Sequence, residues 1–320
     1  MLDFFINTRA RNKEPKIYVS FIFAARNDHH CNNFVERFQN SLNILRDLAG
    51  KYELNCEILV VEWNPPPNMP RLKEVLVFKD NLNSDVKIIT VPNKIHKKIP
   101  KTPYDAIKGD EITFFQNIAQ NAAIRRASGE YVLCSNGDII FNKELIAFLT
   151  KKNLSDKYFY RIIRYDVQKA IPDGLSNEEA LEFCRLNSHS RKNKPEKDRP
   201  YREAAGDFFL MAKKNYERIR GFAEIKCDGF KIDGDMSSCA YLFYKQCILN
   251  DPLRIYHQYH PDRYERAYDR NFHVKKDYRE VYKQSKGLKR ILMRRHKKYK
   301  NCNSRSWGLI DYSLPEEQVD

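Results

Sequence analysis

The chain has 320 residues, of which 42% are hydrophobic and 31% are charged, and its formal net charge is +15. This length can bury a sizeable core, and the composition is that of a soluble globular protein, which excludes a disordered chain. No run approaches the roughly 18 consecutive apolar residues that a membrane-spanning helix needs, and the first 15 residues lack the pattern of a signal peptide. We therefore expect a cytoplasmic protein.

Apolar runs alternate with helical patterns in the first half of the chain. Residues 17–25 are a continuous apolar and β-branched run, which is typical of a strand buried on both faces. The next apolar side chains recur at three- and four-residue steps, which predicts a helix that contains Phe34, Phe38, Leu42, Leu45 and Ala49. Further patterns predict a helix at 109–130 and strands at 56–63, 86–92 and 131–134. This alternation predicts an α/β fold with a mostly parallel sheet and helices on both faces.

The eight cysteines form no C-x-x-C pair. Cys56 and Cys134 fall inside predicted strands, where cysteine serves as a small hydrophobic side chain. This usage favours reduced thiols in the cytosol over a zinc site or a disulfide framework.

Polar residues follow three of the predicted strands: Arg26-Asn27-Asp28, Glu62-Trp63-Asn64 and Asn136-Gly137-Asp138. Ligands of such sheets bind outside the carboxyl ends of the strands, so together these residues predict a binding site. Asp138 could hold a hard divalent cation such as magnesium or manganese, and the cation could in turn bind phosphates. The alternative is an Asx-type turn at 136–138 that closes a hairpin.

The second half begins with a polar segment. Residues 187–202 are nearly devoid of apolar groups and are expected to form a mobile surface loop. A short strand followed by a helix is predicted within 204–222.

Two later motifs contain candidate functional side chains. Asp233 and Asp235 stand just ahead of a predicted helix, where a carboxylate could equally be a helix cap. His257 and His260 lie three residues apart, beside Asp262, and either packing or ligation would explain them.

These motifs resemble a known family. The segment NIAQNAAIRRASGEYVLCSNGD is similar to family 2 of the GT-A glycosyltransferases, in which an alanine-rich helix precedes A-x-GEY, an apolar strand and Asp-x-Asp. FIFAARND and ILVVEWN resemble the family's nucleotide-binding strand ends, and AAGDFFLMAKKNYERIRGFAE resembles its acceptor-side strand with the GF-x-E sequel. IDGDM resembles Glu-Asp-x-Asp-Leu. The resemblance spans about residues 17–262 and implies an inverting, sugar-nucleotide-dependent transfer to a glycan, lipid-linked or protein-linked acceptor.

The resemblance also implies roles for individual residues. Asp233 would be the general base, with Asp235 as the alternative. Asp138 would hold Mn²⁺ or Mg²⁺, with His260 or His257 as a further ligand. A nucleotide sugar, with UDP as the expected nucleotide, contacts the remaining set: Ala25, Arg26, Asn27, Glu62, Asn121, Asn136 and Gly137.

The chain departs from the family pattern at three places. Asn136 stands where the first acid of Asp-x-Asp is expected, Gln120 stands where the arginine of an Arg-Asn pair is expected, and Glu62-Trp63 replaces a pair of acids. These departures bear on metal use and on the identity of the donor, because an amide is a poorer cation ligand than a carboxylate.

We expect three parts: an N-terminal arm (1–16), a GT-A catalytic domain (17–262) and a basic helical C-terminal extension (263–320). The catalytic domain divides into a nucleotide-binding half (17–141) and an acceptor half (142–262). Within the extension, residues 282–300 contain nine Lys and Arg and no acid. This stretch could contact an anionic membrane peripherally, but packing on the catalytic domain is favoured, with an anchor at Trp307.

Three other functions would each explain part of the sequence. A nucleotidyltransferase would carry a glycine-rich loop after its first strand, and AARNDHHCNN contains no glycine. A nucleic-acid-binding protein would explain the charge and the 19 tyrosines, but the basic residues cluster at one end and no known motif is present. A glycosyltransferase-like domain without activity is the third alternative, and Asn136 would be its mark.

Overall fold

The computed structural model describes residues 16–28, 33–78, 86–100, 113–191, 194–197, 206–226, 232–260 and 303–319. Helices and strands alternate along these residues, as the sequence predicts. The helices are α1 (Phe34–Lys51), α2 (Leu72–Val75), α3 (Asn93–His96), α4 (Gln116–Arg126), α5 (Lys143–Thr150), α6 (Asn177–Leu186), α7 (Lys213–Ile219) and α8 (Ile232–Tyr241). Among the described helices, none combines the length and apolarity that crossing a bilayer requires.

An eight-stranded sheet forms the centre of the molecule, in the order β10-β6-β9-β4-β1-β2-β3-β12. Its strands are β1 (Val19–Ala25), β2 (Cys56–Trp63), β3 (Val86–Val91), β4 (Tyr131–Ser135), β6 (Tyr158–Ile162), β9 (Phe209–Ala212), β10 (Lys245–Leu249) and β12 (Glu316–Val319). Strands β4, β1, β2 and β3 are parallel to one another, whereas β9 and β12 run antiparallel to their neighbours. The predicted mostly parallel α/β sheet is therefore confirmed.

A second sheet of four short strands, in the order β5-β11-β7-β8, lies beside the first. Its strands are β5 (Ile139–Phe141), β7 (Arg164–Val167), β8 (Ser188–Ser190) and β11 (Ile255–His257). Strand β5 follows β4 along the chain but pairs with β11 rather than with β4. The turn at 136–138 therefore carries the chain from one sheet to the other, and the hairpin alternative is wrong.

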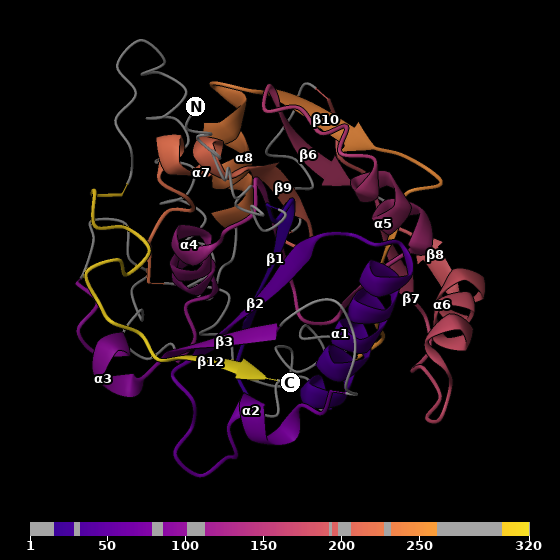
Figure 1. The fold of residues 1–320 in the computed structure, drawn as a ribbon, viewed down its shortest axis with the longest axis horizontal. Helices are drawn as coiled ribbons and strands as arrows, with labels where there is room; N and C mark the ends of the chain where they lie inside the picture. Colours follow the sequence, from indigo (N-terminus) through magenta and orange to yellow (C-terminus); the bar gives the residue numbers. More distant parts are fainter. Residues whose placement is uncertain are drawn as a thin grey trace, which may run out of the picture.

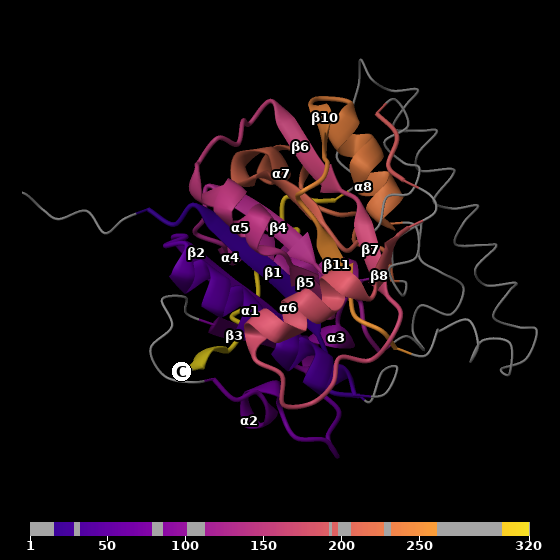
Figure 2. The same cartoon turned by 90° about the vertical axis from the view of Figure 1, so that its right-hand side faces the viewer.

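Two hydrophobic cores fill the two faces of the central sheet. Side chains of α1, α5 and the second sheet build one core, in which Phe38, Leu42 and Phe141 are buried. Side chains of α4, α7 and α8 build the other, together with Trp307 from the end of the chain. Figure 1 shows α4, α7 and α8 on one side of β1, and α1, α5 and α6 on the other; Figure 2 gives the perpendicular view. Helices thus cover both faces, as predicted.

Three boundaries differ from the sequence prediction. The expected loop at 187–202 contains a strand, β8, because an edge strand of a small sheet does not need apolar side chains to pair its backbone with β7. Residues 192–193 and 198–205 of that loop lie outside the described part. Asp233 and Asp235 lie within the first turn of α8 rather than ahead of it. The described part of α4 begins at Gln116, and residues 101–112 are not described.

The C-terminal extension also differs from the prediction where it is described. Residues 303–319 contain turns and a strand instead of a helix, and β12 pairs antiparallel with β3. Lys87 pairs with Glu316 at 3.5 Å and Lys73 with Glu317 at 2.5 Å, so the acidic edge strand matches basic side chains of its neighbours. The basic stretch 282–300 and the arm up to residue 15 lie outside the described residues, and the division into three parts remains a prediction.

Candidate functional site

The carboxyl edge of the central sheet collects residues from several elements. Strands β1, β2 and β4 end at this edge because they are parallel. Strand β9 is antiparallel to β4, so the residues just before it lie at the same edge. Strand β6 also ends here, because it too is antiparallel to β9, and it leads directly into β7. The topology therefore brings residues 136–138, 164–166 and 207 to one place.

Asp138, His257 and His260 form a cluster at this edge. Asp138 Oδ2 lies 3.5 Å from His257 Nε2 and 3.4 Å from His260 Nε2, and the two Nε2 atoms are 3.3 Å apart. One ligand atom from each residue fits within 4.8 Å of the others. These are the three residues that the sequence analysis names as metal ligands.

The pairing of two short strands explains why these residues meet. His257 is the register partner of Ile139, the residue that follows Asp138. Beyond the ladder, Gln258 N donates to the Asp138 carbonyl at 3.0 Å. The Gln258 side chain donates to the Arg37 carbonyl at 2.7 Å and to Ser41 Oγ at 2.9 Å, which fixes β11 against α1. The backbone on both sides of the cluster is therefore held in place.

The electrostatic surroundings favour an ionised Asp138. Burial acts to raise the pKa of this carboxyl, but the adjacent His257 and His260 imidazoles outweigh it and hold the pKa well below its usual range. The set of one carboxylate oxygen and two imidazole nitrogens fits a divalent transition ion such as Mn²⁺ better than Mg²⁺, because Mg²⁺ prefers ligands that are all oxygen. The donor atoms present therefore fit a cation of this kind.

Asn136 lies in a hydrogen-bonded chain beside the cluster. Its Oδ1 accepts from Gln116 Nε2 at 2.5 Å, and its Nδ2 donates to Asp207 Oδ1 at 2.7 Å. The other oxygen of Asp207 accepts from Arg164 NH1 at 2.7 Å. Arg164 Nε in turn lies 2.8 Å from Asp166 Oδ1, and Asp166 adjoins His257.

Asp207, Arg164 and Asp166 belong to the site but are not predicted from the sequence. Asp207 is 3% exposed, although it stands in the quoted segment AAGDFFLM directly before a buried strand. A carboxylate beside such an apolar run is buried and needs a charged or hydrogen-bonding partner. The position of Asp207 in the sequence could therefore have predicted a buried polar contact. Arg164 and Asp166 give no signal, because alternating polar residues in a strand are typical of any solvent-facing side.

Gly137 fits closely under α1. A Cβ atom added here would lie 3.0 Å from ring atoms of both Phe34 and Phe38. The absence of a side chain therefore allows the turn to pack against the helix. The predicted contact of Gly137 with a nucleotide sugar remains a prediction.

The predicted nucleotide contacts at the ends of β1 join neighbouring loops. Ala25 is 1% exposed and pairs in register with Glu62. Arg26 Nε donates to the Asn64 carbonyl at 2.8 Å, and Arg26 NH1 lies 2.6 Å from Asp28 Oδ2. Asn27 Nδ2 donates to the Pro70 carbonyl at 2.9 Å. These contacts shape the edge of the sheet on which the nucleotide is predicted to lie.

Glu62 and Asn121 have internal hydrogen-bond partners. Glu62 is fully buried and accepts from Arg71 Nε at 2.6 Å and from Leu72 N at 2.7 Å. Asn121 exchanges hydrogen bonds with the backbone of Phe222, at 2.8 Å in each direction. Both side chains therefore hold loops in place, and their nucleotide contacts remain predictions.

Asp233 and Asp235 differ in exposure. Asp235 is 2% exposed, whereas Asp233 is only partly buried, with its Oδ1 accepting from Gly234 N at 2.8 Å. Their role in catalysis is not tested by these contacts.

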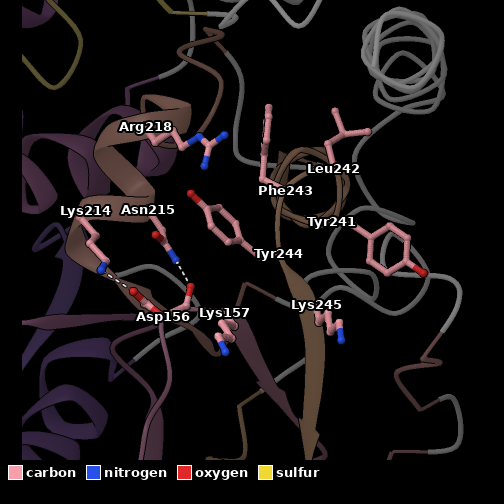
Figure 3. Close-up of a pocket in the computed structure, with 10 residues that line it drawn as sticks. All are labelled: Asp156, Lys157, Lys214, Asn215, Arg218, Tyr241, Leu242, Phe243, Tyr244 and Lys245. Atoms are coloured by element: carbon pink, nitrogen blue, oxygen red, sulfur yellow. Dashed lines mark hydrogen bonds and ion pairs between the residues drawn. The ribbon is translucent and has the colours of Figure 1, made fainter. Parts of the chain in front are cut away.

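A cavity of about 700 Å³ lies at the opposite edge of the sheet, where β4 and β6 begin and α7 follows β9. Its lining combines basic and aromatic side chains, among them Lys214, Arg218, Phe243, Tyr244 and Lys245. In Figure 3, Arg218 and Tyr244 point toward each other, and Lys214 pairs with Asp156. The Arg218 guanidinium lies 4.8 Å from the centre of the Phe243 ring. This cavity is separate from the Asp138 cluster.

No protein-family model and no curated protein matches the sequence. Among solved structures, the chain is similar to S. aureus TarS 1-349 in complex with UDP-GlcNAc, with 17% identity, a TM-score of 0.49, and coverage of 85% of this chain and 66% of that chain. It is also similar to the mannosyltransferase PcManGT from Pyrobaculum calidifontis in complex with GDP-Man and Mn²⁺. The identity is 14%, the TM-score is 0.45, and the match covers 80% of this chain and 60% of that chain. The chain thus spans less than two thirds of either structure, and similarities of this size do not identify its function.

Proposed function

We propose that this chain is a metal-dependent glycosyltransferase, which moves a sugar from a nucleotide-sugar donor to a hydroxyl group with inversion at the sugar carbon. One observation carries the proposal. The aspartate of the Asp-x-Asp-like turn and the two histidines of the distant RIYHQYH segment lie within 4.8 Å of one another, at the edge where parallel sheets bind ligands. The sequence resemblance to family 2 of the GT-A glycosyltransferases supports the same reaction.

Asp138, His257 and His260 would hold the cation, for which Mn²⁺ is the ion expected from the resemblance. When bound, the cation would neutralise the charge of the nucleoside diphosphate that leaves. The rest of the carboxyl edge, with Arg26 and Asn27, would bind the nucleotide.

The general base would be an aspartate at the start of α8. Asp233 is the better candidate because it is partly exposed, whereas Asp235 is 2% exposed. A base has to reach the acceptor hydroxyl, and this requires access.

A thermal-shift panel of UDP- and GDP-sugars, with Mn²⁺ or with chelator, tests the proposal. A donor at about a hundred times its dissociation constant should stabilise the protein by about 2.7 kcal/mol. We expect at least one donor to raise the melting temperature, and to raise it more with Mn²⁺ than with chelator.

Two variants make the test specific. Asp138→Ala should abolish the Mn²⁺-dependent part of the stabilisation, because it removes the only carboxylate of the described cluster. Arg218→Ala, in the cavity at the opposite edge, should keep that part unchanged. Equal stabilisation with Mn²⁺ and with chelator would remove the metal from the proposal, and no stabilisation by any donor would contradict the proposed function itself.

A further inference from the structure

Asp166 lies directly beside His257. The two residues are register partners in the parallel pair of β7 and β11, so the backbone ladder sets their side chains next to each other. Asp166 Oδ1 is shielded from solvent and lies 3.7 Å from His257 Nδ1. The ladder thus places a carboxylate on the side of the imidazole that faces away from the Asp138 cluster.

The two nitrogens of His257 have different neighbours. Nε2 lies 3.5 Å from Asp138 Oδ2 and 3.3 Å from His260 Nε2, whereas Nδ1 faces Asp166. A neutral imidazole that binds a metal through Nε2 carries its proton on Nδ1, and that N–H needs an acceptor. The two atoms are 3.7 Å apart, which is longer than a hydrogen bond, so an approach of about 0.5 Å would make Asp166 this acceptor.

Arg164 forms an ion pair with the carboxylate that would accept this hydrogen bond. Its Nε lies 2.8 Å from Asp166 Oδ1, and its NH1 donates to Asp207 Oδ2 at 2.7 Å. Asp207 is itself 3% exposed and accepts from Asn136. Because Arg164 keeps Asp207 as a partner, its charge stays paired when Asp166 is neutralised. Asp166 is therefore not required merely to compensate Arg164.

We propose that Asp166 is a positioning residue, which accepts a hydrogen bond from the Nδ1–H group of His257 and so directs the Nε2 lone pair toward the metal. The inference rests on the proposed function, because it assigns a role around the same metal site. It explains why a second carboxylate and an arginine lie behind the cluster.

The direct test is an electron-paramagnetic-resonance titration of the full chain with Mn²⁺ alone. Loss of an outer partner of a ligating histidine typically weakens metal binding by about 10- to 100-fold. We expect Asp166→Asn to raise the Mn²⁺ dissociation constant by about that factor, while the melting temperature of the metal-free protein stays close to that of the wild type. Asp173→Asn changes an exposed aspartate in the same way and should keep the wild-type affinity.

The tautomer of His257 provides a second readout, which a merely structural role would not change. In metal-free protein with ¹⁵N-labelled histidine, we expect the Nδ1–H form of His257 in the wild type and a shift toward Nε2–H in Asp166→Asn. If the variant does not fold, the wild-type spectrum is sufficient for the test. An Nε2–H form of His257 in the wild type would overturn the inference.

The outcomes separate this inference from the proposed function. A folded Asp166→Asn variant with wild-type Mn²⁺ affinity would overturn the role of Asp166 and leave the glycosyltransferase proposal intact. A wild-type protein that binds Mn²⁺ but is stabilised by no sugar nucleotide would overturn the proposed function and leave the role of Asp166 to the Mn²⁺ comparison. A wild-type protein that does not bind Mn²⁺ would overturn the role of Asp166 together with the metal.

Discussion

At the scale of single residues, the site depends on which group stands at position 136. The resembled family has an acid there, and this chain has an amide with two partners. Asn136 accepts from Gln116 and donates to Asp207. Only a group that is both donor and acceptor can accept from Gln116 and donate to Asp207 at once. The neighbours Gln116 and Asp207 thus suit the amide that stands at position 136 in place of an acid.

Placing an acid at this position should therefore destabilise the protein. Asn136→Asp would set a carboxylate against Asp207 where Nδ2 now donates at 2.7 Å. Two carboxylates at that distance repel each other when both are ionised, so one of them takes a raised pKa. A carboxyl whose pKa is raised in the folded state loses stability as pH rises through its ordinary value toward the raised one.

Urea denaturation at several pH values measures this effect. Relative to the wild type, we expect the unfolding free energy of Asn136→Asp to fall as pH rises from 4 to 7. Asn153→Asp, at an exposed asparagine between α5 and β6, is the control. A variant that is as stable as the wild type at pH 7 would mean that Arg164 can neutralise both acids.

Asp233 is the proposed general base. Asp233→Asn keeps the shape of the side chain and removes its basicity, so transfer should fall by about 10² to 10⁴ while donor binding changes little. Turnover and the thermal shift with donor, measured on the same preparation, separate the two effects. If Asp235→Asn has this effect and Asp233→Asn does not, the base is the buried residue; if neither lowers turnover, the base lies elsewhere.

At the scale of elements, the end of the chain joins helix α4 to the loop after α7. Asn303 hydrogen-bonds to the backbone of Arg220, Phe222 and Glu224. Trp307 is 2% exposed, as the sequence analysis predicts for an anchor, and Arg125 lies over its ring. Residues far apart in the sequence thus form one structural unit.

Glu224 is the titratable group of this unit. Burial raises its pKa above the ordinary value, while hydrogen bonds from Gly308 N and Asn121 Nδ2 act against the rise. Because the folded-state pKa is raised, the stability that the protonated form contributes is present at low pH and is lost as pH rises through the folded-state pKa.

The variant Glu224→Gln tests the direction in which stability changes with pH. The amide does not ionise, so the unfolding free energy of the wild type should fall relative to the variant as pH rises above about 4.5, by about 1.4 kcal/mol for each pKa unit of the shift. Chemical denaturation between pH 4 and 8 measures the difference. A wild type that gains stability over the variant across this range would show that the hydrogen bonds dominate over burial.

The elements that could be predicted from the sequence are those with strong local patterns. Strand β2 has the predicted bounds, because a β-branched run stops at Asn64 and three prolines. Strands β8 and β12 were missed because polar edge strands look like loops. In the site, the turn and the histidine spacing predict Asp138, His257 and His260 as ligands, and the structure brings them together. That they bind a metal stays a prediction. The series of side-chain contacts that links Asn136, Asp207, Arg164 and Asp166 depends on strand pairing, and no local sequence pattern predicts that pairing.

At the scale of the whole molecule, the two edges of the central sheet carry different surfaces. The carboxyl edge holds the Asp138 cluster, and the opposite edge holds the basic and aromatic cavity of Figure 3. The net charge of +15 is not explained by the candidate site, because much of it lies in residues 282–300, outside the described part. The described chain is fixed on both sides of this stretch, by Gln258 before it and Asn303 after it.

The basic stretch 282–300 could either pack on the catalytic domain or contact a membrane. Leu288, Ile291 and Leu292 are spaced as one narrow apolar stripe of a helix, and a buried tryptophan follows at 307. A narrow stripe close to an anchored segment favours packing on the catalytic domain. We therefore expect Leu288→Ser with Ile291→Ser to lower the melting temperature, and expect the wild type not to co-sediment with anionic vesicles at physiological salt. A membrane role predicts an unchanged melting temperature and co-sedimentation with anionic vesicles, because each cation near an anionic surface contributes about 1 kcal/mol to binding. Salt-sensitive binding to anionic but not neutral vesicles, lost when Lys289, Arg290, Arg294 and Arg295 are changed to Glu, would establish that role instead.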